Sequence, residues 1–258
     1  MTDEVPKTWK LTVEYDGSNY SGWQEQANAK AVAGELRRVA EELLRQPVDL
    51  HGAGRTDAGV HALGQVAHLR IRGASAPPPD VMMREMNERL PSSIVVLAVE
   101  PADGRFHARH DAVARTYAYR ISTRKSAFHK RHVWWVKDRL DIAVMSRAAR
   151  MLEGRHDFVC FRALDKSDPG HARESTIVVV STARIEQDGD EIVFRIEASH
   201  FLWRMVRRLV GVIVRIGQGQ VTTDDLMRLL SGKCDPKLDV AAWTAPASGL
   251  FLEKVKYR

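Results

Sequence analysis

The order of strand and helix patterns constrains the fold of this chain most. Alternation of apolar and polar residues predicts strands, and apolar residues at helical spacing predict helices. Over the first hundred residues this gives, in order, a strand over 10–15, a helix over 31–45, a strand in the segment after Pro47, a strand over 64–71, a helix over 81–90 and a strand over 94–100. That order is the split βαβ unit of ferredoxin-like folds.

The second half reads as a looser copy of the first. Its expected elements are a strand over 115–122, a helix over 142–152, a short strand over 158–161, a hairpin of 176–186 with 191–197 around Asp188-Gly189, helices over 201–216 and 223–230, and a strand over 250–256. No residue-level repeat links the halves, so the duplication is inferred from element order alone.

The predicted fold class is therefore α+β. We expect two ferredoxin-like halves forming a pseudo-symmetric antiparallel or mixed sheet, with helices on one face and a central basic cleft. The N-terminal lobe is expected over residues 1–104 and the C-terminal lobe over 105–258.

Composition narrows the class of partner. The 258 residues are 44% hydrophobic, which is ample for a packed core, and carry a formal charge of +6 with a pI near 9.4. Such a balance favours an acidic partner, with nucleic acid first and an anionic membrane surface second, although many basic proteins bind nothing charged. What decides between these readings is where the charge lies.

Cysteine usage and hydropathy predict the compartment. No stretch approaches the roughly 20 apolar residues that cross a bilayer, and the first residues have no apolar core. Cys160 and Cys234 form no Cys-x-x-Cys motif, which leaves open a single disulfide or two buried thiols. A reducing compartment is the default, so we expect a cytoplasmic protein without a membrane partner.

Positive charge is concentrated in the segment 115–137, which contains no acidic residue. Its basic residues are Arg115, Arg120, Arg124, Lys125, Lys130, Arg131 and Lys137, and its aromatic residues are Tyr117, Tyr119, Phe128, Trp134 and Trp135. Basic side chains contact phosphates while aromatic faces accept unstacked bases. The alternative is one buried and one solvated face of a strand, and for both tryptophans core packing is the favoured role.

The helix over 201–216 offers a second basic surface. Arg204, Arg208 and Arg215 fall within roughly 40° of one another at 100° per residue. No Asp or Glu occurs between Ala198 and Thr223. A purely solvated helix normally mixes the two signs, so an acidic partner is favoured over that simpler reading.

The glycine-rich stretch 52–61 holds the candidate for chemistry. Three glycines let the main chain approach a bulky planar substrate, and Asp57 lies two positions from Arg55. A guanidinium keeps its proton, so Arg55 is able to hold a carboxylate ionised or to bind an anionic group. An ordinary turn, in which Asp57 bonds its own backbone, explains these residues equally well.

Longer motifs favour the first reading. GAGRTDAGVHALGQVAH at 52–68 resembles the central motif of the tRNA pseudouridine synthase A family. Arg115-Thr116-Tyr117-Ala118-Tyr119 resembles its R-x-Y-x-Y strand, residues 194–207 resemble its third block, and Gly249-Leu250-Phe251-Leu252 is similar to its closing strand. The likeness spans nearly the whole chain.

The resemblance implies an isomerase that converts uridine to pseudouridine at positions 38, 39 or 40 of the tRNA anticodon stem-loop, without a cofactor and as a homodimer. It makes Asp57 the catalytic carboxylate and Arg207 its ion-pair partner. Tyr117 would pack against the target base and Arg55 would contact the RNA. Arg115, Arg204 and Arg208 are further candidates for RNA binding.

Other chemistry is less well supported. A non-catalytic RNA-binding protein would use the same basic cleft. Asp157, Asp165 and Asp168 suggest a two-metal nuclease only weakly, since the last two lie in a segment with loop composition. The pairs His107/His110 and His129/His132 lack further ligands in sequence, so no metal site is expected.

Overall fold

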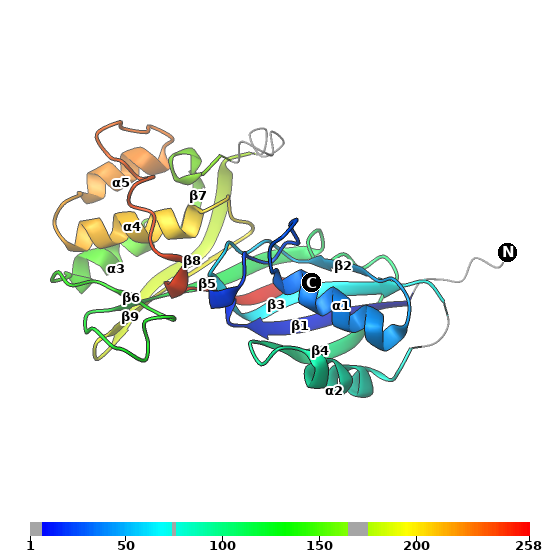
Figure 1. Cartoon of the computed structure of the whole chain (residues 1–258). Coiled ribbons are helices and arrows are strands. Elements are labelled where there is room, and N and C mark those ends of the chain that lie inside the picture. The colour runs from blue at the N-terminus through cyan, green and yellow to red at the C-terminus, as the bar shows by residue number, and fades with distance from the viewer. Residues whose placement is uncertain (1–6, 74–75, 165–174) are drawn as a thin grey trace. The chain divides into compact units, whose positions relative to one another are not determined.

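The computed structural model describes residues 7–73, 76–164 and 175–258 and contains two compact units (Figure 1). The first unit is the chain as far as Val113 together with Phe251–Arg258, and the second unit is Ala114–Leu250. Within the described ranges, no helix is both long and apolar enough to cross a membrane.

The first unit is built on a mixed sheet. Its strands lie in the order β4 (Ile94–Ala102), β1 (Lys7–Tyr15), β3 (His61–Ile71) and β10 (Leu250–Tyr257), and β2 (Asp49–Gly52) pairs with β3. β1 runs antiparallel to both β3 and β4, whereas β10 runs parallel to β3, with Phe251 opposite His61. The C-terminal strand therefore completes a sheet that the first hundred residues begin.

Two helices cover apolar residues of this sheet. α1 (Val32–Leu44) buries Leu36 and Val39 completely and ends at Arg45, which adopts a left-handed conformation. α2 (Pro79–Arg89) begins with a proline, whose missing N–H costs nothing in the first turn. α1 packs against α2 and β2, and α2 packs against β4.

The second unit contains the remaining strands and helices of the described residues. The strands lie in the order β5 (Ala112–Ser122), β9 (Glu191–Ala198), β8 (Ile177–Asp188) and β7 (Gly154–Asp157), and β6 (Trp134–Trp135) pairs in parallel with β5. The helices are α3 (Ile142–Arg150), α4 (Met205–Gly217) and α5 (Thr223–Leu230). α3 packs against both β8 and α4, and α5 packs against β7 (Figure 1).

The α+β class and the mixed sheet predicted from the sequence are confirmed, and the differences are local. The strand expected over 158–161 is wrong: β7 lies just before it, and Val159–Phe161 form a 3-10 turn with Phe161 buried. The hairpin turn is Gly189-Asp190, one residue later than expected, because Gly189 supplies the positive φ of 53°.

Of the two possibilities left open for the cysteines, the disulfide is the one observed. Cys160 and Cys234 are bonded to each other across a sequence separation of 74, with their Cα atoms 5.4 Å apart. The bond links the 3-10 turn that follows β7 to the segment that follows α5.

Candidate functional site

The candidate site of the first unit is the glycine loop, residues 53–60, which joins β2 to β3. The Ala53 amide donates to the carbonyl of Val66, and the Val60 amide donates to the carbonyl of Asp57 at 3.1 Å. The Gln65 side chain donates to the carbonyl of Gly54 at 3.0 Å. The loop is thus closed on itself and fastened to the strand that it enters.

A neighbouring segment, residues 16–23 after β1, supports the glycine loop through the backbone. The Trp23 amide donates to the carbonyl of Thr56 at 3.1 Å, and the Gly59 amide donates to the carbonyl of Tyr20 at 3.3 Å. These two hydrogen bonds, one on each side of Asp57, therefore fix the main chain that carries it.

Tyr15 and Thr56 form a hydroxyl pair beneath the loop. Their oxygens lie 2.7 Å apart, and the residues are only 2% and 6% exposed. Thr56 is buried, whereas its neighbour Arg55 is exposed and Asp57 is half-buried. The pair orients the middle of the loop and so presents the predicted carboxylate at the surface of the unit.

Two glycines allow the close approach of the supporting segment. A Cβ on Gly17 would lie 2.0 Å from the carbonyl oxygen of Val60. Gly22 has φ +109°, and a Cβ there would lie 2.6 Å from the carbonyl oxygen of Thr56. A larger side chain at either position would push the glycine loop away from its support.

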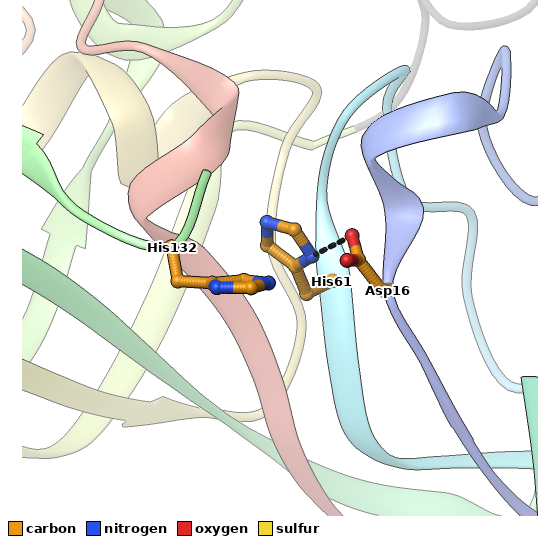
Figure 2. A group of neighbouring side chains, drawn as sticks. All are labelled: Asp16, His61 and His132. Atoms are coloured by element: carbon orange, nitrogen blue, oxygen red, sulfur yellow. Dashed lines mark ion pairs between the residues drawn. The ribbon is translucent and has the colours of Figure 1, made fainter. Parts of the chain in front are cut away.

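Asp16 and His61 link the same two segments from the other end of the glycine loop (Figure 2). His61 is 1% exposed, and its Nδ1 lies 3.1 Å from both the Gly17 amide and Oδ1 of Asp16. A neutral Nδ1 accepts from the amide, and a protonated one donates to the carboxylate. In either state the ring ties the start of β3 to the end of β1. His132, which the figure also labels, belongs to the second unit.

Asp49, His51 and His68 cluster where β2 pairs with β3. His68 is fully buried and its Nδ1 accepts a hydrogen bond from the Ala108 amide at 3.1 Å, which puts the proton of the neutral ring on Nε2. Burial is the main cause that lowers the pKa of His68 to about 4, and nearby His107 lowers it further. A protonated Nε2 is no metal ligand, so this geometry favours a neutral structural histidine.

In the second unit, Arg115 and Tyr117 contact the segment that leads into α4. A terminal nitrogen of Arg115 donates to the carbonyl of Ser199 at 3.0 Å. The half-buried Tyr117 ring meets the Phe201 ring edge to face, with 5.0 Å between centroids. Tyr119, two positions on, is fully buried, and burial raises the pKa of its hydroxyl far above the usual value.

The arginines at the start of α4 occupy three different environments. Arg204 is exposed, has φ 59° and lies 4.7 Å from the ring centroid of Trp203, so it precedes the helix rather than sharing a helical face. Nε of Arg207 donates to the carbonyl of Ala245 at 2.7 Å. Arg208 donates to the carbonyl of Arg162 at 2.5 Å, and burial lowers its pKa. Of the basic face expected from Arg204, Arg208 and Arg215, the place of Arg204 is therefore wrong, because this residue precedes α4.

The two adjacent tryptophans differ in the same way. Trp134 packs edge-on against Tyr119, with 6.3 Å between ring centroids, as core packing requires. Trp135 is 41% exposed, and Nζ of Lys125 lies 5.3 Å from the centre of its ring. Core packing is thus the wrong role for Trp135, because β6 is only two residues long and successive strand residues face opposite ways.

The structure brings Arg55 and Asp57 together on one loop of the first unit. It places Arg115, Tyr117, Arg204, Arg207 and Arg208 in the second unit. Of the carboxylates considered for a nuclease, Asp157 accepts from the Val159 amide at 3.0 Å, and Asp165 and Asp168 lie outside the described residues. The Tyr15–Thr56 pair was missed from the sequence, although the strand alternation that ends at Tyr15 predicts an inward side chain there.

Comparison with known proteins agrees with the motifs. The family described as tRNA pseudouridine synthase matches residues 11–111 and 148–258. A tRNA pseudouridine synthase A of Paramagnetospirillum magneticum is 39% identical over 252 residues, covering 96% of this chain and 94% of the relative. The proteins of the same name from Chlorobaculum tepidum and Acetivibrio thermocellus are 40% and 37% identical, and each alignment covers at least 96% of both chains.

Proposed function

The chain belongs to the tRNA pseudouridine synthase family, and we propose that it converts uridine to pseudouridine at positions 38, 39 or 40 of the tRNA anticodon stem-loop, with Asp57 as the nucleophile. The observation that carries the proposal is the glycine loop. Its RTDAGVH sequence is held by two backbone bonds and a buried hydroxyl pair, and it presents a half-buried carboxylate.

The reaction is an isomerisation, which needs no cofactor. The bond between N1 and C1′ breaks, the uracil turns, and C5 bonds to C1′; the proton on C5 leaves to solvent and N1 gains one. Asp57 would act as an anion that attacks C6 or C1′, or that assists formation of a glycal. Its partial burial favours this role, because a half-buried carboxylate has fewer water molecules to displace when the substrate binds.

An anion in this position needs a cation. The proposal assigns that role to Arg207, whose Nε is bound to the carbonyl of Ala245. This bond fixes the plane of the guanidinium, and two parallel N–H groups of a fixed guanidinium match a carboxylate. A guanidinium carries a permanent positive charge, so Arg207 is proposed as the ion-pair partner of the Asp57 carboxylate.

The target base must leave its stack at a cost of a few kcal/mol, which contacts in the pocket offset. Tyr117 is proposed as the platform for the base, since its ring is half-buried and braced edge-on by Phe201. Arg55, exposed beside Asp57, is proposed to contact the RNA, together with Arg115, Arg204 and Arg208. The net charge of +6 suits tRNA as the partner, and a cytoplasmic homodimer remains part of the proposal.

Position mapping tests the proposal. Three tRNA transcripts would each carry a single uridine among positions 38, 39 and 40, and pseudouridine would be located by chemical labelling and primer extension. We expect modification in at least one transcript with the wild type and in none with Asp57→Ala. Modification elsewhere in the tRNA, or equal modification by both proteins, would refute the assignment of position or of residue.

A further inference from the structure

The second unit contains a cavity that none of the proposed catalytic residues lines. Its volume is about 310 Å³, at the lower end of the range for small-molecule sites. β6 supplies Trp134 and Trp135, the C-terminal half of α4 supplies Arg215 and Gln218, and the segment 242–244 supplies Trp243.

Trp243 is held in place by α4. A Cβ on Gly211 would lie 1.9 Å from the carbonyl oxygen of Trp243, so the backbone of the segment rests directly on the helix. About one turn later, the guanidinium of Arg215 lies 5.6 Å from the centre of the Trp243 ring. Arg215 is itself bonded to the side chain of Gln220. The indole is therefore fixed before any ligand arrives, which lowers the entropic cost of stacking on it.

Gln218 gives the cavity a polar group in need of a partner. Its Nε2 donates to Oδ2 of Asp138 at 3.0 Å. A carboxylate only accepts, so this bond fixes the orientation of the amide and identifies the other atom as Oε1. Oε1 is shielded from solvent and has no hydrogen-bond partner among the described residues. A buried acceptor left unpaired is unfavourable, and an N–H group of a ligand would satisfy it once the side chains that shield Oε1 from the cavity move aside.

Charge around the cavity favours an anionic aromatic ligand. Lys137 and Arg215 line it, and Asp138, the one acid that lines it, is engaged by Gln218. The segment 115–137 that leads to it contains no acid at all. The fixed indole of Trp243, an unpaired acceptor and nearby cations together match a nucleobase with its phosphate.

We propose that this cavity is a subsite for one unstacked nucleobase of the bound RNA, stacked on Trp243, hydrogen-bonded to Gln218 Oε1 and with its phosphate near Lys137 and Arg215. The proposal rests on the proposed function in so far as tRNA is the partner. It adds a contact distinct from the target uridine, whose platform is Tyr117.

The test measures affinity for an unmodified tRNA transcript by filter binding. One stacked base contributes enough that Trp243→Leu should weaken binding about 5- to 100-fold, and Trp243→Phe, which keeps an aromatic face, should restore most of it. Gln218→Leu should also weaken binding severalfold, whereas Gln187→Leu, at an exposed glutamine of β8, should not. Thermal unfolding would show that each variant is folded, and Gln218→Leu keeps the test valid should Trp243→Leu fail to fold.

Affinities within twofold of the wild type for both folded variants would overturn the subsite. So would a loss of self-association in these variants with unchanged affinity for tRNA, since the cavity would then receive a second copy of the chain. Tritium release from tRNA labelled at uridine C5, measured on the wild type, separates the two proposals. Its absence would refute the isomerase activity, whereas release by the wild type with unaltered tRNA binding by the variants would refute only the subsite.

Discussion

Replacing Tyr15 with phenylalanine tests whether the buried hydroxyl pair positions the glycine loop. The Tyr15 and Thr56 oxygens are 2.7 Å apart and both residues are buried. Tyr15→Phe removes one hydrogen bond and leaves the Thr56 hydroxyl without it, which should lower the free energy of unfolding by about 1–3 kcal/mol. Thr56→Val removes the other partner at nearly constant shape and should cost a similar amount.

The double variant is the informative control. When both partners become apolar, no buried hydroxyl is left, so the double variant should cost less than the sum of the single variants by at least about 1 kcal/mol. Urea unfolding followed by circular dichroism measures these differences.

Activity provides the second readout. A small displacement of a catalytic group costs up to about 100-fold in rate, so Tyr15→Phe should reduce kcat by about 10-fold or more, while KM for tRNA changes little. Strict additivity of the stability changes would refute the coupling between the hydroxyls. A stability loss with unchanged kcat would refute the positioning of Asp57 through Thr56.

Three further predictions follow from local contacts. Gly17→Ala should destabilise the fold by about 1–3 kcal/mol in thermal unfolding, because its Cβ would lie 2.0 Å from a backbone oxygen. Gly54→Ala is the control and should be far milder, since its Cβ would meet nothing within 4 Å. Equal effects of the two variants would contradict the close approach at Gly17. The pKa of His68 is about 4 in the folded state and near 6.5 in the unfolded state, so between these pH values the unfolded state binds more protons. The free energy of unfolding should therefore fall by about 2 kcal/mol from pH 8 to pH 5. Urea unfolding midpoints measure this pH dependence, and the variant His68→Gln should lose it. Reducing the Cys160–Cys234 bond, which spans 74 positions, should lower the free energy of unfolding by about 2–4 kcal/mol, and a Cys160→Ser/Cys234→Ser variant should not respond to reductant.

Local patterns sufficed for most elements because each has its own periodicity. Leu36 and Val39 lie on the buried face of α1, and the alternation ending at Tyr15 matches the burial of β1. The misplaced strand at 158–161 shows the limit, since a short apolar run fits a strand or a buried turn equally well. Phe161 is buried by its neighbours in space, which periodicity alone does not reveal.

The candidate site was predictable only where a motif marked it. RTDAGVH identified Asp57 and Arg55, but the segment that supports them comes from residues 16–23, some forty positions earlier. The different environments of Arg204 and Arg208 depend on one left-handed residue and one backbone carbonyl, neither of which a helical projection contains. Pairings between distant segments, such as β10 with β3, likewise depend on the whole fold.

The central claim is that the carboxylate of Asp57 performs the isomerisation. The most direct measurement is tritium release from unmodified tRNA labelled at uridine C5, because forming the new bond to C1′ expels that hydrogen. The wild type and Asp80→Asn, which alters an exposed acid at the start of α2, should release tritium at similar rates, and Asp57→Asn should release none above background. Release by Asp57→Asn at the wild-type rate would contradict the claim.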